Sequence, residues 1–184
     1  DYTVAELVTI NDATTGQITL NSPGTNLTGT SANLTSAFAG DITVHTGRLT
    51  ISNGNYTVAQ LKAINAATTG NIILTDPSGN ISGTSSDIVS AFAGNVTQHT
   101  GTVTITNTNY TLAELVTINA ATDGSITLDN TGVALSGTVA NFKSAFAGQV
   151  TTHTGTVTIS DPSETDITAT DITSINTTNT GTII

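Results

Sequence analysis

The sequence predicts an α/β protein: a right-handed solenoid whose coils of about 27 residues, each a short helix with parallel strands, pair into 54-residue repeats. The first observation behind this prediction is that Tyr-Thr recurs every 54 residues, at Tyr2, Tyr56 and Tyr110. Ala-Phe-Ala-Gly and His-Thr-Gly recur at the same spacing, with their rings at Phe38, Phe92, Phe146, His45, His99 and His153. No insertion separates the copies. Because an uneven stack would break the contacts between neighbours, we expect them to lie one on another.

The repeats cover the whole chain. They run over residues 1–54, 55–108 and 109–163, and residues 164–184 match the start of a fourth. That last match needs an offset of 165 residues where three repeats of 54 give 162, so a three-residue insertion falls near Asp161. We expect one continuous solenoid, with the insertion in a loop.

Helix-start signals open each half of a repeat and are the second observation. Thr3 and Glu6 have the spacing of a capping box, in which each side chain binds a free backbone amide of the first turn. The pair recurs as Thr57 with Gln60 and Thr111 with Glu114, and weaker versions stand at Thr30, Thr84 and Thr138. A glycine that would end the second-half helix in a left-handed conformation follows at Gly40, Gly94 and Gly148. Helices of about 8–10 residues are marginal alone, so we expect stacking to stabilise them.

Alternating segments between the helices are the third observation. In Thr102–Thr106, Val103 and Ile105 point to one face of a strand and the threonines to the other. Equivalent core pairs are expected at Ile18/Leu20, Leu49/Ile51, Ile72/Leu74, Ile126/Leu128 and Val157/Ile159. Successive coils would then place parallel strands about 4.8 Å apart, joined by right-handed crossovers. An all-β solenoid is the alternative, because Thr and Val also favour strands.

Composition excludes several functions. The net charge is −10, with Arg48, Lys62 and Lys143 as the only Lys or Arg residues, so the clustered cations of a nucleic-acid binder are missing. No apolar run approaches the roughly 20 residues that span a bilayer, so we expect no membrane insertion. The absence of Cys excludes disulfides and thiolate metal sites. A Thr/Asn-rich, Lys-poor chain offers few sites to trypsin-like proteases, which favours an extracellular location.

The recurring histidines are the strongest candidates for a site. Two coils separate successive copies, so His45, His99 and His153 are expected roughly 9–10 Å apart. Zinc needs ligands within about 2.1 Å, which such a row cannot supply. We therefore expect each imidazole to pack or form hydrogen bonds at its turn.

Acidic residues do not recur with the repeat. Asp12 becomes Ala66, and Asp41 becomes Asn95. Calcium needs six or more oxygen ligands, so no repeated calcium site is expected, and we expect no cofactor. A single calcium site at Asp161, Glu164 and Asp166 is the weak exception.

Asparagines do recur, directly after the isoleucine of each first-half helix, at Asn11, Asn65, Asn119 and Asn176. A ligand-binding ladder is one interpretation. We favour amides that bind backbone groups near the helix end.

Neither a catalytic nor a uniform binding surface stands out. Nucleophilic catalysis needs a base with an orienting group, and no acid recurs beside the histidines, so we expect no enzyme. Outward threonines such as Thr102, Thr104 and Thr106 form a Thr-x-Thr array of the kind found in ice-binding solenoids. Arg48 and Ile73 interrupt it. A binding module for ice or glycans is therefore the alternative function.

Two motifs carry a resemblance across essentially the whole chain. They are Tyr-Thr-x-Ala-x-Leu-x-x-Ile-Asn-Ala-Ala-Thr, as at residues 56–68, and Gly-Thr-Val-Thr-Ile-Thr, as at 101–106. The sequence resembles the tandem Thr/Asn-rich repeats of very large bacterial surface proteins, cyanobacterial cell-surface and adhesin-like proteins among them. The resemblance implies an extracellular component of a stalk, filament or surface layer. Its expected partners are neighbouring repeats or further copies of the chain, end to end.

Overall fold

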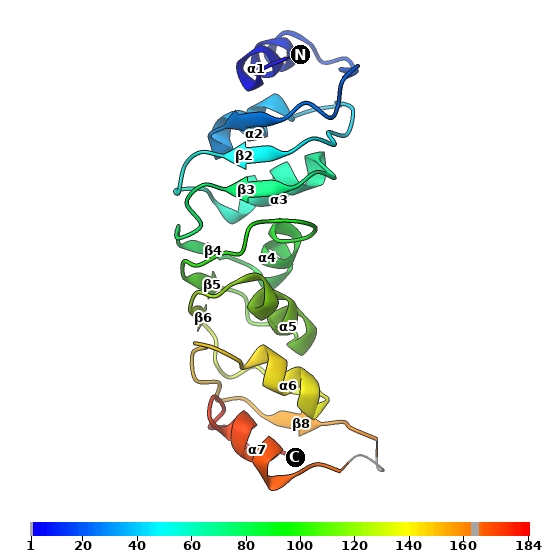
Figure 1. The fold of residues 1–184 in the computed structure, drawn as a ribbon. Coiled ribbons are helices and arrows are strands. Elements are labelled where there is room, and N and C mark those ends of the chain that lie inside the picture. Colours follow the sequence, from blue (N-terminus) through cyan, green and yellow to red (C-terminus); the bar gives the residue numbers. More distant parts are fainter. Residues whose placement is uncertain (1, 163–165) are drawn as a thin grey trace. The chain divides into compact units, whose positions relative to one another are not determined.

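The computed structural model describes residues 2–162 and 166–184 of the chain. These residues divide into two compact units. Figure 1 labels the helices and strands of the chain. The first comprises Asp1–Gly79 and Ser90–His99, and the second Asn80–Val89 and Thr100–Ile184. Each unit is an assembly of short helices and short parallel strands, so the predicted α/β class is confirmed.

The first unit contains three helices and three strands that lie within it whole. The helices are α1 (Val4–Ala13), α2 (Ser31–Ala37) and α3 (Val58–Ala67), and the strands are β1 (Leu27–Gly29), β2 (Leu49–Ile51) and β3 (Ile72–Leu74). The strands form one parallel sheet in the order β1-β2-β3, with Leu27 opposite Leu49 and Leu49 opposite Ile72. The helices pack in chain order, α1 on α2 and α2 on α3.

The second unit repeats this arrangement. Its strands are β4 (Ile81–Gly83), β5 (Val103–Ile105), β6 (Ile126–Leu128), β7 (Leu135–Gly137) and β8 (Val157–Ile159). They form a parallel β4-β5-β6 sheet and a parallel β7-β8 pair. Its helices α5 (Leu112–Ala121), α6 (Val139–Ala145) and α7 (Ala169–Asn176) also pack in chain order, while α4 (Ser85–Ala91) lies across the division of the units.

The helices begin where the caps predict. The Thr3 hydroxyl accepts from the Glu6 amide at 3.2 Å, and the Glu6 carboxylate accepts from the Thr3 amide at 2.8 Å. Complete capping boxes also open α3, α5 and α7, whereas in α2 and α6 only the Thr side chain caps. Seven helices stand in the described residues, so the all-β alternative is wrong.

Glycines end the second-half helices as expected. Gly40, Gly94 and Gly148 have φ of 80°, 73° and 71°, the left-handed region that costs a residue without Cβ least. We call each half of a repeat a half-repeat. The first half carries α1, α3, α5 or α7, and the second half carries α2, α4 or α6.

Most predicted strand residues face a core. Leu49, Ile51, Val103 and Ile105 are completely buried. Two expectations need correction. Ile18 forms only an isolated bridge with Ile42, so the 18–20 segment is no strand.

The second correction concerns Ile159, which is half-buried although its equivalents Ile51 and Ile105 are fully buried. No alternating pattern in the sequence predicted the strands β1, β4 and β7. Each ends in a glycine, and its three residues are too short for a clear alternation.

Candidate functional site

Each recurring histidine is fully buried beside a phenylalanine of its own half-repeat. The Nε2 atoms of His45, His99 and His153 lie 2.8, 2.7 and 2.7 Å from the carbonyl oxygens of Thr25, Gly79 and Val133. Because a carbonyl oxygen only accepts, each Nε2–H is the donor. The rings lie 5.3, 5.5 and 5.5 Å from those of Phe38, Phe92 and Phe146. These imidazoles bind one half-repeat to the backbone of another.

The other ring nitrogen faces a further half-repeat. The Nδ1 of His45 lies 3.4 Å from the Thr68 hydroxyl, and that of His153 lies 2.8 Å from the Asn179 amide oxygen. Burial lowers the pKa of His45 and His99, because it penalises the charged imidazolium. In the described residues, no three His, Cys, Asp or Glu side chains gather in a group that could hold a metal ion.

The recurring asparagines join consecutive helices. The side-chain amide of Asn11 donates to the carbonyl oxygens of Ser36, Ala37 and Ala39, at the end of α2. Asn65 donates in the same way to Ala91 and Ala93, and Asn119 to Ala145 and Ala147. The sequence indicated a helix end, but the acceptors belong to the helix of the next half-repeat. Asn176 is exposed, and its side chain has no such acceptor among the described residues.

A second row of capping side chains was missed by sequence reasoning. Side-chain oxygens of Asn53, Asn107 and Asp161 accept from the first helical amides of Ser31, Ser85 and Val139 at 2.7, 2.8 and 2.7 Å. The three residues recur every 54 positions, which is the signal that could have found them. They connect the end of each second half-repeat to the start of its own helix and satisfy free amides there.

The weak calcium candidates lie partly outside the described residues. Asp161 and Asp166 line a hollow of about 390 Å³ together with Lys143 and Asp171, and Glu164 is not among the residues described. One Asp161 oxygen already accepts from Val139. The Lys143 ammonium lies 2.9 Å from the Asp171 carboxylate, which it helps to hold at a pKa of about 2. Because Glu164 lies outside the described residues, the calcium site stays a prediction.

The three recurring tyrosines differ in the hydrogen bonds of their hydroxyl groups. Tyr110 donates to the Asn130 carbonyl at 2.7 Å, and Tyr2 to that of Ser22 at 3.0 Å. The Tyr56 hydroxyl is buried with no hydrogen-bond partner among the described residues. Burial, with the charge of Asp76, raises the pKa of Tyr56 to about 12.

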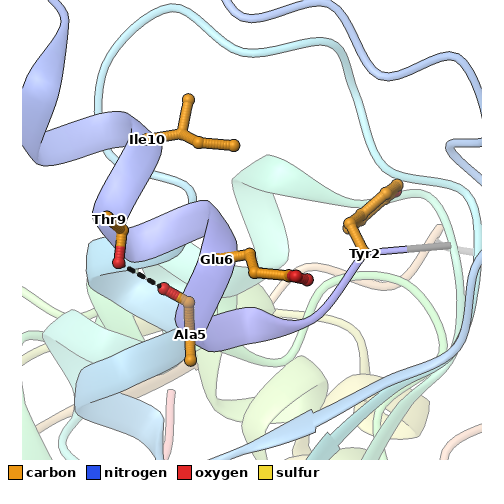
Figure 2. Close-up of a pocket in the computed structure, with 5 residues that line it drawn as sticks. All are labelled: Tyr2, Ala5, Glu6, Thr9 and Ile10. Carbon is orange, nitrogen blue, oxygen red and sulfur yellow. Dashed lines mark hydrogen bonds between the residues drawn. The ribbon is translucent and has the colours of Figure 1, made fainter.

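An accessible apolar surface lies on α1. Tyr2, Ala5, Glu6, Thr9 and Ile10 line an open hollow of about 480 Å³ (Figure 2). Ile10 is 46% exposed, whereas its equivalents in α3 and α5 are completely buried. The Thr9 hydroxyl in the hollow donates to the Ala5 carbonyl at 3.0 Å, and Glu6 supplies one carboxylate.

Comparisons with protein-family models, with curated proteins and with solved structures found no match for this chain. In the described parts of the chain, none of the helices has the length and apolar character needed to cross a membrane.

Proposed function

We propose that this chain is an extracellular structural segment of a surface stalk, filament or layer protein. In this proposal the half-repeats form a right-handed solenoid, and neighbouring repeats of the same kind continue it end to end. Its task is to hold other modules at a fixed separation. Such stacks gain stability from contacts between neighbours.

The observation that carries the proposal is the use of the recurring polar side chains. The recurring histidines and the Asn11 row of asparagines bind backbone groups of another half-repeat. A protein selected for binding or catalysis keeps such groups free and convergent in a pocket. Here they join one half-repeat to the next, as a stacked structural protein requires.

The charge and composition of the chain support the proposed extracellular location. Thirteen acidic residues against three basic ones give the chain a net charge of −10, which keeps stacks apart in solution. The scarcity of Lys and Arg also removes cleavage points for trypsin-like proteases.

Inserting further copies of residues 55–108 after residue 108 tests the proposal. Each repeat adds two strand layers, so the maximum dimension from small-angle X-ray scattering is expected to rise by roughly 10 Å per added repeat. Growth with about the 0.38 power of chain length, as in a globule, contradicts a solenoid. Antibody labelling of intact source cells tests the location, and labelling only after lysis contradicts a surface protein.

One observation favours the binding alternative. On the outward face of the β4-β5-β6 sheet, Ser82, Thr104 and Thr127 stand opposite one another as a row of hydroxyls. The equivalent row of the first unit ends in Ile73. If the parent chain inhibits ice recrystallisation and Thr104→Lys does not, the result supports this alternative. If the parent chain shows no inhibition, ice binding is excluded.

A further inference from the structure

Two surfaces carry residues whose equivalents elsewhere in the chain are covered by a second half-repeat. The first, the α1 end face, consists of Glu6, Ile10, Thr14, Gly16 and Ile18. Thr14 and Gly16 are exposed and Ile18 is half-buried, whereas Thr68, Thr122, Ile72 and Ile126 at the equivalent positions are buried. The comparison between α1 and α3 is direct, since both lie in the first unit.

The residues that cover the α3 equivalents identify the missing partner. The Ser31 hydroxyl donates to Gln60 at 3.0 Å, and the Thr68 hydroxyl donates to the His45 carbonyl at 3.0 Å. Leu49 of β2 pairs with Ile72. All three covering residues belong to one second half-repeat, residues 30–54.

Glycine 70 shows how closely that second half-repeat approaches. A Cβ on Gly70 would collide with the carbonyl oxygens of Gly47 and Thr46. A Cβ on Gly16, its equivalent, would have only the Thr14 hydroxyl within 4 Å, at 3.4 Å. Gly16 therefore keeps a space for a backbone that no described residue fills.

The backbone of the α1 end face also has a free parallel edge. Ile72 pairs on both sides, with Leu49 and with Val96, while Ile18 pairs only with Ile42. The turn next to this edge is already formed, because the Gly16 amide donates to the Thr14 hydroxyl as Gly70 does to Thr68. A partner strand could add here without rearrangement.

The second surface, the α7 end face, is formed by Ile172 and Asn176 in the second unit. Ile172 is half-buried, whereas its equivalents Leu7, Leu61 and Leu115 are buried. Asn176 lacks the helix-end carbonyls that the other asparagines of its row bind. Those carbonyls always come from a second half-repeat, so this surface selects the same partner.

We propose that both end faces are docking surfaces for a second half-repeat of this same sequence type. The inference depends on the structural role proposed above and specifies its partner. Both faces belong to first halves, so neither complements the other. Two identical copies of this segment therefore do not stack end to end. A neighbour joins only in phase, that is, with a second half placed against a first half.

Two extended chains of equal length test the α1 end face. One carries residues 25–54 directly before residue 1, which reproduces the junction at residues 54–55, and the other carries residues 1–30 there. In the in-phase chain, hydrogen exchange of the Thr15 amide is expected to slow at least about tenfold, because the equivalent Thr69 amide donates to the His45 carbonyl at 2.9 Å. No slowing in the in-phase chain, or equal slowing in the out-of-phase chain, overturns the proposal.

Gly16→Ala distinguishes docking from general stabilisation. In the in-phase chain it is expected to abolish the slowing, whereas in the parent chain it leaves exchange unchanged and so controls for folding. Thr15→Ala is the matched control, because Thr15 and its equivalent Thr69 are both exposed. Slowing that survives Gly16→Ala contradicts the proposed contact.

Residues 20–54 added after Ile184 test the α7 end face, with Asn176→Ala expected to weaken the new contact. The parent chain is expected to stay monomeric in sedimentation velocity at high concentration, and end-to-end assembly of the parent overturns the phase rule. Docking that succeeds in a protein absent from the cell surface refutes only the proposed function. Failed docking in a chain that lengthens linearly with added repeats refutes only this inference.

Discussion

Helices α1 and α3 lie in the same unit, share the pattern Val-Ala-x-Leu-x-x-Ile-Asn and differ in the burial of one face. Val4 and Leu7 of α1 are buried, as are Val58 and Leu61 of α3. On the other face, Ile10 is 46% exposed while Ile64 has no exposed surface. The residue types therefore decide which faces are apolar, and a neighbouring half-repeat decides which apolar face is buried.

The largest expected effect comes from the isoleucine that differs in burial. Ile64→Ala removes methyl groups from a filled interior and is expected to lower the free energy of unfolding by about 3 kcal/mol. Ile10→Ala is expected to cost under about 1 kcal/mol, because its side chain is half in water already. Urea denaturation of both variants measures the difference. Equal losses would contradict the view that coverage, and not residue type, sets the energy.

The glycines sharpen the comparison at the backbone. Gly70→Ala places a methyl group against two carbonyl oxygens of the preceding half-repeat, and a loss of about 2 kcal/mol or more is expected. Gly16→Ala is expected to change the free energy of unfolding by less than about 0.5 kcal/mol. Thermal unfolding of the two variants checks this. A tolerated Gly70→Ala would show that the half-repeats are more loosely packed than the close approach indicates.

The sequence predicted the local structure well because its signals act over three or four residues. The Thr3–Glu6 box and the Gly40 cap follow from such spacings, and both are present. Which residues form contacts across two half-repeats depends on the register between those half-repeats. The 54-residue period does not fix that register.

Asn11 illustrates this limit. It reaches carbonyls 25 to 28 positions ahead, a separation that no local rule gives. The exposure of Ile10 could not be predicted either, because Ile10 and the buried Ile64 occupy the same position in the repeat.

Tyrosine 56 tests whether coverage always stabilises. It is covered, but its hydroxyl lacks a partner, so Tyr56→Phe is expected to leave stability unchanged or raise it by about 1 kcal/mol. Tyr110→Phe removes a bonded hydroxyl and is expected to cost about 1 kcal/mol. Chemical denaturation of the two variants measures this, and a clear loss in Tyr56→Phe would point to an acceptor for its hydroxyl.

The smallest expected effect concerns the caps of the two helices. The Thr3 amide and hydroxyl donate to the Glu6 carboxylate and hold its pKa below 4.5, whereas α3 uses the neutral Gln60 in the same place. A carboxyl whose pKa is lower in the folded state stabilises it above the unfolded pKa, and that contribution disappears as the pH falls. The start of α1 is therefore expected to fray as the pH drops below about 4.5, while the start of α3 does not.

Amide exchange of Glu6 and Gln60, followed by NMR as the pH is lowered, measures this difference. Each rate is compared with that of the unfolded chain at the same pH. Glu6→Gln is the matched control, because it gives α1 the cap that α3 already has and should remove the pH dependence. If α1 still frays in Glu6→Gln, its uncovered face and not its cap limits its stability in acid. The difference in stability between the two helices would then come only from the half-repeat that covers α3 and does not cover α1.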